Sequence, residues 1–436
     1  MKPEKVFKRY DIRGRYPEEL DEEFAERLGK AVGSFVKNNF NGKTVVCRDN
    51  KDTSGPLKDN LIEGLRSTGV KVFDAGVGPT DYSAYAGMKK EAVSVQVTSS
   101  HLPLEFNGFK LTYPEGNGFI NEDLNAVKDI FRSEEFEQGD GGLAYFADSI
   151  KKDYRRGLVE TAKEYSDGLY NKKVVVDSLG GASTEFLAGA LRELGAEVVD
   201  IAESKDEHPY RDPPNPKPEK LEELKSLVEE ENADIGLATD MDADRVALYR
   251  DGFVSGSEIF SLMALKVKGD VVASIDTSQA VEDIVEGQGD EIYYTRVGDP
   301  FVMDKALEVD AALAGEPNGH YSVLDFVPYN SGTLTALVLA GLDIDSALEE
   351  VPEYYVERDN LKVEDKEEKM ALAEEIVEAE HEVISRVDGV KALIDGAEVL
   401  IRPSGSSPKI RVISEASDES VAERGLEEAL RILRKA

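Results

Sequence analysis

KTVVCRDNKDTSGPLKDNLIEGLRSTGVKVFDAG, residues 43–76, holds the pattern that decides the fold. Two short runs rich in valine, KTVVCRD and VKVFDAG, enclose a segment with the periodicity of an amphipathic helix. Gly69 ends that segment, and glycine there allows the left-handed backbone that often closes a helix. A strand, a helix and a second strand in this order predict a β-α-β unit of a parallel sheet.

The same pattern returns twice along the chain. The second copy comprises KKVVVDS (172–178), ASTEFLAGALRELG (182–195) and AEVVDIA (196–202). The third comprises DVVASID (270–276), TSQAVEDIVEGQG (277–289) and DEIYYTRVG (290–298). Three similar α/β domains with mixed, largely parallel sheets are therefore expected. An additional helix is predicted over residues 21–36, and the proline-rich segment 208–220 is predicted to be a loop.

The pattern changes after about Val356. Residues 366–387 are predicted to form a charged amphipathic helix, and residues 417–436 a second one. Between them, Asp395-Gly396 is typical of a hairpin turn joining alternating strands. This segment predicts a fourth domain of the α+β class with an antiparallel sheet. The expected organisation is four domains, 1–149, 150–249, 250–355 and 356–436, around a central cleft.

The charge of the chain restricts its partners. Its 436 residues include 52 basic and 88 acidic ones, so the formal net charge is 52 − 88 = −36. A charge of this sign argues against binding nucleic acid or an anionic membrane surface. The acids are spread along the chain, and we interpret them as adaptation of a soluble surface to a salty cytosol. Without a signal-peptide pattern or a long apolar run, a cytoplasmic location is expected. Cys47 lies in an apolar run and is predicted to be a buried thiol.

The first of four chemically suggestive loops is VTSSHLPLEFNGFK, residues 97–110. It follows an apolar run and contains Ser100 with His101 beside it and Lys110 downstream. A serine hydroxyl next to a base can be an activated nucleophile. On its own, however, the pair is more typical of a turn that ends a strand, because the loop offers no third orienting group.

The second loop, ATDMDADR (238–245), places acids at every other position: Asp240, Asp242 and Asp244. If the chain curls, their oxygens surround one point and suit a hard cation such as Mg²⁺. An EF-hand is excluded because Arg245 stands where that loop requires glycine. A solvated acidic loop is the alternative, but the apolar runs IGLA and VALY on either side favour a metal site.

The third and fourth loops carry groups that suit sugars and phosphates. In AGEPNGHYS (314–322), Glu316, Asn318 and His320 alternate, so an extended loop would project them from one side toward sugar hydroxyls. IRPSGSSPKIR (401–411) offers guanidinium, hydroxyl and backbone donors for a phosphate, from Arg402, Ser404, Gly405, Ser406, Ser407 and Arg411. Each loop alone is also compatible with an ordinary turn.

Together, in this order and across the whole chain, the four loops resemble those of the α-D-phosphohexomutase family. FKRYDIRG (7–14), CRDNKDTSG (47–55) and TRVGDPFVMD (295–304) extend the resemblance. The resemblance implies that Ser100 carries phosphate and that Ser100, Asp240, Asp242 and Asp244 hold Mg²⁺. It implies that Glu316, Asn318 and His320 contact sugar hydroxyls and that Arg402, Ser404, Gly405, Ser406 and Arg411 clamp the phosphate that is not reacting. Tyr10, Arg13 and Arg296 would line the cleft.

The implied reaction interconverts hexose 1-phosphates and 6-phosphates through a phosphoserine and a hexose 1,6-bisphosphate, which serves as intermediate and activator. Arg245 would stabilise the charge of the phosphoserine, with His101 beside it. Lys110 and His320 would transfer protons, His320 because it titrates in the useful range and Lys110 if basic surroundings lower its pKa. The basic residues of the four loops would then form a cationic cleft inside an anionic shell.

Three departures from the family pattern concern hexose preference and activity. Leu102 replaces asparagine beside the serine, Met241 replaces glycine in the acidic loop, and Asn318 replaces serine in the sugar loop. YDIRG resembles the phosphomannomutase/phosphoglucomutase branch, which favours mannose or glucose phosphates. The alternatives are a phosphoglucosamine mutase and a non-catalytic sugar-phosphate-binding protein of the same fold. A monomer or a homodimer is expected.

Overall fold

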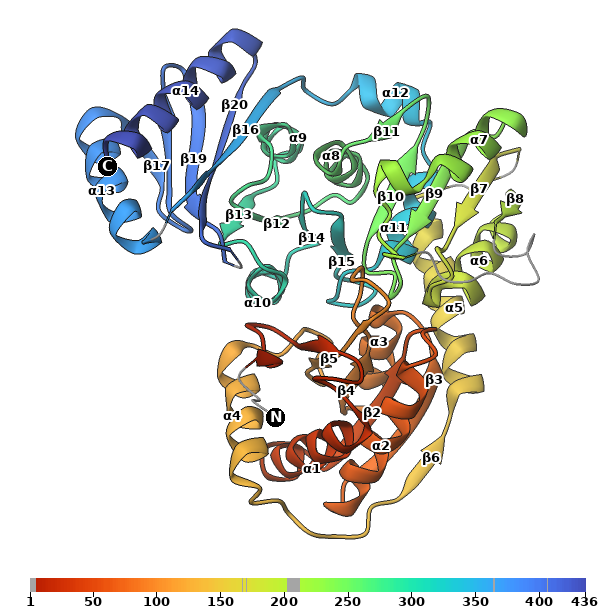
Figure 1. Cartoon of the computed structure of the whole chain (residues 1–436). Helices are drawn as coiled ribbons and strands as arrows, with labels where there is room; N and C mark the ends of the chain where they lie inside the picture. Colours follow the sequence, from red (N-terminus) through yellow and green to blue (C-terminus); the bar gives the residue numbers. More distant parts are fainter. Residues whose placement is uncertain (1–4, 167, 170, 202–211, 364, 406) are drawn as a thin grey trace.

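A computed structural model describes residues 5–166, 168–169, 171–201, 212–363, 365–405 and 407–436, in which the strands form four sheets (Figure 1). The first sheet has the order β1-β5-β4-β2-β3-β6, in which β2, β3, β4 and β6 are parallel and β1 and β5 antiparallel to their neighbours. Its strands are β1 (Ile12–Arg15), β2 (Lys43–Arg48), β3 (Lys71–Val77), β4 (Val93–Val97), β5 (Phe106–Thr112) and β6 (Leu143–Tyr145). Its helices are α1 (Glu22–Asn39), α2 (Ser54–Ser67), α3 (Thr80–Lys90) and α4 (Asn121–Ser133).

The second and third sheets are also mixed. The second, β11-β10-β9-β7-β8, comprises β7 (Lys173–Asp177), β8 (Glu197–Asp200), β9 (Ile235–Thr239), β10 (Val246–Tyr249) and β11 (Phe253–Val254). Its helices are α5 (Ala147–Glu164), α6 (Leu187–Glu193) and α7 (Glu222–Glu230), with short 3₁₀ turns at Ala182–Glu185 and Pro218–Lys220. The third, β13-β12-β14-β15, comprises β12 (Val271–Ser274), β13 (Ile292–Thr295), β14 (Leu313–Glu316) and β15 (His320–Val323). Its helices are α8 (Gly256–Lys266), α9 (Gln279–Gln288), α10 (Asp299–Val309), α11 (Gly332–Ala340) and α12 (Ile344–Glu349).

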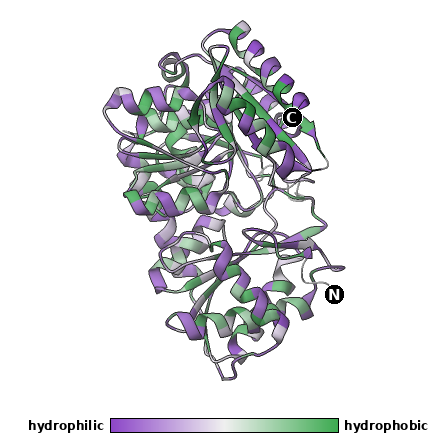
Figure 2. Cartoon of the chain, turned by 90° about the vertical axis from the view of Figure 1, so that its left-hand side faces the viewer, coloured by the Kyte–Doolittle hydropathy of each residue, from purple (hydrophilic) through white to green (hydrophobic). Residues whose placement is uncertain are grey.

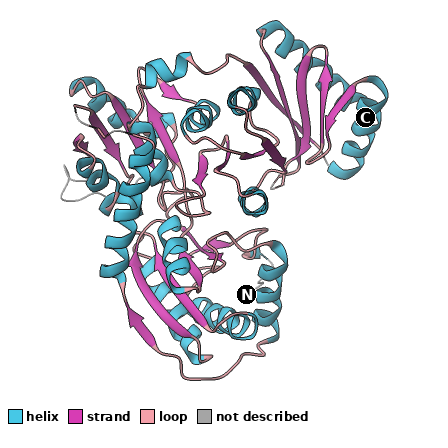
Figure 3. Cartoon of the chain, turned by 180° about the vertical axis from the view of Figure 1, so that it is seen from behind, coloured by secondary structure: helices cyan, strands magenta, loops and turns pink. Residues whose placement is uncertain are grey.

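The fourth sheet is antiparallel throughout, with the order β16-β20-β19-β18-β17. Its strands are β16 (Tyr355–Lys362), β17 (Glu382–Ser385), β18 (Val390–Ile394), β19 (Ala397–Pro403) and β20 (Lys409–Ala416). Helices α13 (Lys366–Glu380) and α14 (Glu419–Lys435) pack on one side of it (Figure 3). The predicted fold class, three α/β units followed by an antiparallel α+β unit, is confirmed.

The periodicities that predicted the helices correspond to buried faces. In α1 the side chains of Phe24, Leu28, Val32 and Phe35 are buried, as the helical spacing predicts. Hydrophobic and hydrophilic residues alternate along the helices in Figure 2, as expected for elements with one face on a core. Helices α1 and α2 approach closely because Gly29 lacks a side chain, since a Cβ there would lie 2.3 Å from the carbonyl oxygen of Leu61.

Two predicted helices are shorter than expected. The helix predicted over residues 366–387 ends at Glu380, where His381 has an extended backbone and the chain enters β17. Pairing of β17 with β18 outweighs the helical propensity of this charged segment. The helix predicted over residues 182–195 is a 3₁₀ turn followed by α6, because the amide of Ala182 donates to Met241 O (2.7 Å) and ties the first turn to the acidic loop. The glycines that were predicted to close the helices, Gly69, Gly195 and Gly289, all have positive φ.

The predicted proline-rich loop lies partly outside the described residues, because 202–211 are not described. From Asp212 onward it is irregular up to the 3₁₀ turn at Pro218. Cys47 is fully buried, and burial raises the pKa of its thiol, so it fits the predicted structural role. In the part of the chain that the structure describes, no helix combines the length and apolar character needed to span a membrane.

A buried polar pair links α3 to α5, within a core shared by the first three units. Tyr154 donates its hydroxyl to Asp81 Oδ2 (2.7 Å), and the amide of Tyr82 donates to Oδ1 (3.0 Å). Asp81 is completely buried, and burial raises its pKa to about 7. The carboxyl group of Asp81 is therefore protonated in the folded protein at pH values where an exposed aspartate is charged.

We expect this carboxyl group to make stability fall as the pH rises. A raised folded-state pKa means that the folded chain binds the proton more tightly, so the stabilisation is complete below pH ~4 and is lost as the pH rises through about 7. For one group the loss is at most about 4 kcal/mol. Urea unfolding between pH 4 and 8 should show this slope in the wild type and a flatter curve in Asp81→Asn. An equal slope in Asp81→Asn, or a change of the same size in the exposed control Asp59→Asn, would contradict the assignment.

Candidate active site

The predicted loops from the first three units meet in one pocket. Its lining includes these predicted residues, which lie far apart in the sequence: Tyr10, Arg13, Ser100, Lys110, Asp244, Arg245 and His320. Asn318 and Arg411 line a second, larger pocket that lies between the third and fourth units. The Ser100 loop follows β4, the acidic loop joins β9 to β10, and the phosphate loop joins β19 to β20.

Ser100 is held in a sparsely populated backbone conformation. Its φ is +51°, in the left-handed region, which is uncommon for a residue other than glycine and frequent at functional sites. The side chain is buried, and Oγ donates to Asp240 Oδ2 (3.0 Å) and lies 3.2 Å from His101 Nδ1. Burial and the charges of Arg245 and Arg13 lower the pKa of His101 to about 3, so the ring beside Ser100 is neutral.

The acidic loop lies between two buried strands, as its flanking sequence predicted. Asp240, Asp242 and Asp244 are at most 1% exposed and offer ligand atoms within 4.8 Å of one another. Asp242 Oδ1 is buried and has no hydrogen-bond partner among the described residues. An oxygen-only donor set with a buried, unpartnered carboxylate oxygen fits a hard divalent cation. The loop's positive φ falls on Ala243 (+54°) and not on Met241, so replacement of glycine by Met241 is compatible with its backbone.

Lys110, on β5, makes two ion pairs with this loop. Its Nζ donates to Asp242 Oδ2 (2.7 Å) and to Asp244 Oδ2 (2.5 Å). Burial alone favours the neutral amine, but the two carboxylates hold the pKa of Lys110 well above its usual value. The condition under which Lys110 would transfer a proton, a pKa lowered by basic surroundings, is therefore not met, because acidic groups surround the amine.

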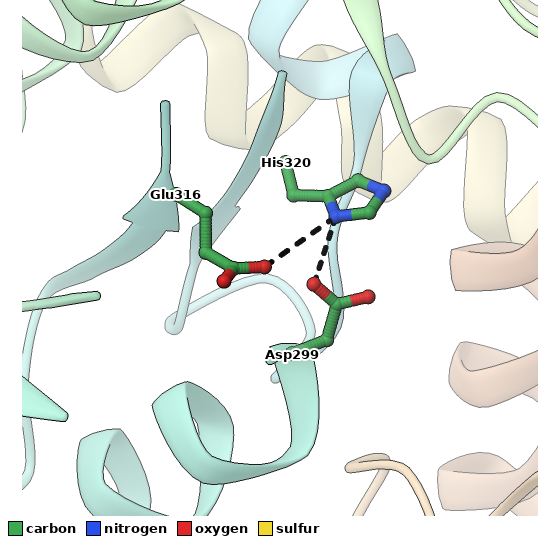
Figure 4. Close-up of side chains that lie close together, drawn as sticks. All are labelled: Asp299, Glu316 and His320. Carbon is green, nitrogen blue, oxygen red and sulfur yellow. Dashed lines mark hydrogen bonds and ion pairs between the residues drawn. The ribbon is translucent and has the colours of Figure 1, made fainter. Parts of the chain in front are cut away.

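Glu316 and His320 face each other across a hairpin and do not alternate along an extended loop. They end β14 and begin β15, and they pair in register. His320 Nδ1 lies 2.8 Å from Asp299 Oδ1 and 3.8 Å from Glu316 Oε2 (Figure 4). Burial and then the neighbouring Asp299 raise the pKa of Glu316 to about 7. Asn318 joins this cluster by donating from Nδ2 to Glu316 Oε2 (3.2 Å).

Both nitrogens of the His320 ring are engaged. Arg245 Nε donates to Nε2 (2.9 Å), so the ring proton lies on Nδ1 and is donated to Asp299. Despite burial, the carboxylates of Asp299 and Asp244 raise the pKa of His320 well above its usual value. Nε2 also lies 3.3 Å from Asp244 Oδ1, a carboxylate oxygen that can accept from Nε2 when that nitrogen carries a second proton. The expectation that His320 titrates in the ordinary range is therefore not supported.

The predicted cationic cleft is neutralised in part by acids. Arg402 Nη2 lies 2.6 Å from Asp388 Oδ2, and its Nε donates to the same oxygen (2.8 Å). Arg13 Nε lies 2.5 Å from Asp11 Oδ2. The guanidinium of Arg296 lies over the ring of Phe301, 3.4 Å from its centroid. The prediction that these basic side chains simply face an anion was incomplete, because carboxylates already orient two of them.

The phosphate loop is described except for Ser406, which lies outside the described residues. Ser404 is buried, and Ser407 Oγ donates to Ser404 Oγ (2.8 Å). Gly405 is exposed, and Arg411 pairs with Arg402 across β19 and β20, which places the two side chains on the same face of the sheet.

Four residues near the predicted groups were missed by the sequence analysis: Arg9, Lys51, Asp299 and Asp388. Lys51 is buried, and its Nζ donates to Ser99 Oγ and to Phe106 O (3.1 Å), beside the serine loop. Arg9 lies over the rings of Tyr10 and Phe301. Arg9, Lys51 and Asp299 lie within the segments FKRYDIRG, CRDNKDTSG and TRVGDPFVMD. The resemblance of these segments to the family was the feature of the sequence that could have identified the three residues.

Gly332, the first residue of α11, lies against the acidic loop. Its amide donates to Ala243 O (2.9 Å), and a Cβ on it would lie 2.4 Å from Arg245 O. We expect Gly332→Ala to displace the loop and lower kcat/KM at least about tenfold, with a loss of about 1–3 kcal/mol in stability. Gly287→Ala in α9, which meets nothing within 4 Å, is the matched control; it should leave kcat/KM unchanged and raise stability by about 0.5–1 kcal/mol, as alanine does in a helix. Wild-type kinetics in Gly332→Ala would show that the loop tolerates the shift.

Four models of phosphoglucomutase/phosphomannomutase domains match the chain in order. The alpha/beta/alpha domains I, II and III match residues 4–138, 145–252 and 247–354, and the C-terminal domain matches residues 360–432. The fold and the loops at the pocket thus define a phosphomutase, which is an isomerase. The chain belongs to the phosphoglucomutase/phosphomannomutase family of α-D-phosphohexomutases.

Relatives within the family carry different substrate names. A phosphoglucomutase/phosphomannomutase of Thermococcus kodakarensis is 34% identical over 99% of this chain and 99% of its own length. A probable phosphoglucosamine mutase of Methanopyrus kandleri is 32% identical over 99% of this chain and 98% of its own. A phosphopentomutase of Thermococcus kodakarensis is 32% identical over 95% of this chain and 94% of its own.

Solved structures share the fold over the whole chain. A phosphoglucomutase/phosphomannomutase family protein from Burkholderia thailandensis superimposes with a TM-score of 0.88 at 25% identity and covers 100% of this chain and 98% of its own. An Aspergillus fumigatus N-acetylphosphoglucosamine mutase in complex with GlcNAc-6P and magnesium has a TM-score of 0.56 at 13% identity, over 82% of this chain and 93% of its own.

Proposed function

We propose that the protein interconverts hexose 1-phosphates and 6-phosphates, with Ser100 as the phosphoryl carrier. The observation that carries this proposal is the contact between Ser100 Oγ and Asp240, which places a buried hydroxyl against the acidic loop inside the pocket. In each half-reaction the P–O bond to Ser100 breaks and a P–O bond to the sugar hydroxyl forms, or the reverse. The hexose 1,6-bisphosphate then turns over in the cleft, so that its other phosphate returns to Ser100.

Asp240, Asp242 and Asp244, together with the phosphate on Ser100, are proposed to hold Mg²⁺. When bound, the cation withdraws charge from the phosphoryl group and orients it for transfer. Arg245 lies beside this loop and in the pocket lining, where its guanidinium can stabilise the remaining negative charge. The neutral ring of His101 packs beside Ser100 without adding a competing charge.

The proton of the attacking sugar hydroxyl needs an acceptor in the pocket. His320 is proposed for this role once its Nε2 has given a proton to the leaving oxygen, because neighbouring carboxylates otherwise hold the ring protonated. Lys110 is held as an ammonium group by two carboxylates and is better suited to orienting them. Glu316 and Asn318 are proposed to read sugar hydroxyls, with Tyr10, Arg13 and Arg296 along the cleft.

The phosphate that is not reacting is proposed to bind at Arg402, Ser404, Gly405, Ser406 and Arg411. Arg402 Nε and Nη2 already contact Asp388, so Nη1 is the end of the fork that remains for the phosphate. Arg411 on the neighbouring strand adds a second guanidinium on the same face. Such a clamp can hold either phosphate of the bisphosphate, as the turnover of the intermediate requires.

Mannose and glucose phosphates are the proposed substrates, on the resemblance of YDIRG to that branch. Glucosamine phosphate is the second candidate, because relatives of nearly equal identity bear that name. Comparing kcat/KM for mannose, glucose and glucosamine 1-phosphates, with Mg²⁺ and a hexose 1,6-bisphosphate present, tests the assignment. The proposal predicts that a mannose or glucose phosphate is best. A preference for glucosamine 1-phosphate by orders of magnitude would overturn it.

A further inference from the structure

Thr80, the first residue of α3, bridges the first unit to the acidic loop of the second. The side chain is completely buried, and Oγ1 donates to Asp242 Oδ2 at 2.7 Å. The amide of Thr80 donates to the main-chain oxygen of the same aspartate at 2.9 Å. One residue therefore holds both the backbone and the carboxylate of Asp242, across 162 positions of sequence.

The two carboxylate oxygens of Asp242 differ in their hydrogen bonding. Oδ2 accepts from Thr80 Oγ1 and from Lys110 Nζ, each at 2.7 Å. Oδ1 is buried and receives no hydrogen bond from any described residue. A carboxylate fixed through one oxygen in this way cannot rotate freely, so it presents the other oxygen in a constant direction.

The two donors to Oδ2 differ in how they respond to a cation. The ammonium group of Lys110 repels a divalent cation bound at the same carboxylates, and it is paired with Asp244 as well. The hydroxyl of Thr80 is neutral, so its hydrogen bond to Oδ2 remains favourable when a cation binds Oδ1. Main-chain contacts from Ala182 to Met241 and from Gly332 to Ala243 fix the loop elsewhere, but they do not reach the carboxylate.

From this geometry we infer that Thr80 is a positioning residue for the cation site: its hydroxyl orients Asp242 so that Oδ1 is a metal ligand. The inference rests on the metal site of the proposed function and adds a residue of the first unit that acts through Asp242. Loss of an outer hydrogen bond of this kind typically weakens metal binding 10–100-fold.

Direct binding of Mn²⁺, measured by electron paramagnetic resonance on the full chain, tests the inference without recourse to activity. All variants are compared in the same phosphorylation state, which intact-mass measurement verifies. Thr80→Val keeps the shape and removes the donor, so we expect its Kd for Mn²⁺ to rise about 10–100-fold. Thr80→Ser keeps the hydroxyl and should restore binding to within a few-fold of wild type.

Thr44→Val on β2 is the matched control. Thr44 is also completely buried, but its hydroxyl has no hydrogen-bond partner within the described ranges, so its removal should leave the Kd unchanged. Melting temperatures of wild type and variants, measured in chelator so that no cation is bound, show how much each substitution disturbs packing. In turnover assays, Thr80→Val should raise the Mg²⁺ concentration for half-maximal rate more than it lowers the rate at saturating Mg²⁺.

The outcomes separate this inference from the proposed function. If the wild type and Thr80→Val bind Mn²⁺ equally well, Thr80 does not orient Asp242 for metal binding. The proposal that the acidic loop holds a cation is then unaffected. The same conclusion follows if Thr80→Ser is as weak as Thr80→Val, because the effect is then one of packing. If the wild type itself binds no Mn²⁺ and works fully in chelator, the metal function and the inference fail together.

Discussion

Ser100→Ala is expected to lower mutase turnover on the order of 10⁴-fold or more, because it removes the atom proposed to carry the phosphoryl group between substrates. The backbone strain at φ +51° is the same for serine and alanine, so the substitution adds none. The hydrogen bonds of Oγ with Asp240 and His101 are lost, which changes stability by about 1–2 kcal/mol. Coupled assays at saturating hexose 1-phosphate, with a melting curve on the same sample, measure both effects.

The neighbouring hydroxyl provides the control. Ser99 is also fully buried, but its Oγ donates to Phe106 O, at the side of the loop where Lys51 lies. Ser99→Ala should therefore lose far less activity than Ser100→Ala, about tenfold at most. If Ser100→Ala kept more than a few per cent of wild-type turnover, the phosphoryl group would have to travel by another route.

Asp240→Asn is expected to lower kcat/KM about a thousandfold while it stabilises the chain in the absence of metal. Removing one of three anionic ligands weakens the hold on a divalent cation, whose contribution to phosphoryl transfer is worth several kcal/mol. Three carboxylates buried to within 1% exposure lie close together, and Lys110, Arg245 and His320 offset only part of their mutual repulsion in the absence of metal. Neutralising Asp240 relieves this repulsion, and asparagine can still accept the hydrogen bond from Ser100.

Opposite signs for activity and stability distinguish this prediction from simple damage to the fold. Melting temperatures with chelator and with excess Mg²⁺ should move in opposite directions relative to wild type. Asp129→Asn, the control, removes a carboxylate that is 74% exposed. It should leave kcat/KM and both melting temperatures unchanged. If Asp240→Asn lost stability with and without metal, the aspartate would be a structural residue.

The repeated strand and helix pattern was sufficient to predict three α/β units and an antiparallel fourth, because hydrophobic periodicity reports directly on which face is buried. It misjudged residues 366–387, where pairing of β17 to an existing sheet outweighs local helical preference. It also misjudged the first turn of the segment after β7, which contacts with the acidic loop hold in a 3₁₀ conformation.

The candidate site could be predicted as far as its loops, but not its ion pairs. Ser100, Lys110, Asp244 and His320 come together as the sequence suggested. The acids that orient the basic side chains, such as Asp388 beside Arg402, are indistinguishable in sequence from the other acids of a chain with 88 of them. Contacts such as that of Thr80 with Asp242 join units far apart in the chain, and local patterns carry no information about them.

Transfer of phosphate to Ser100 is the most direct test of the account. The purified chain is incubated with a hexose 1,6-bisphosphate and Mg²⁺, and its intact mass and phosphopeptides are measured before and after addition of excess hexose 6-phosphate. The account predicts one added phosphoryl group on Ser100 that leaves on that addition, and no adduct on Ser100→Ala. A wild-type chain that takes up no phosphate, or takes it up equally when Ser100 is alanine, would contradict the account.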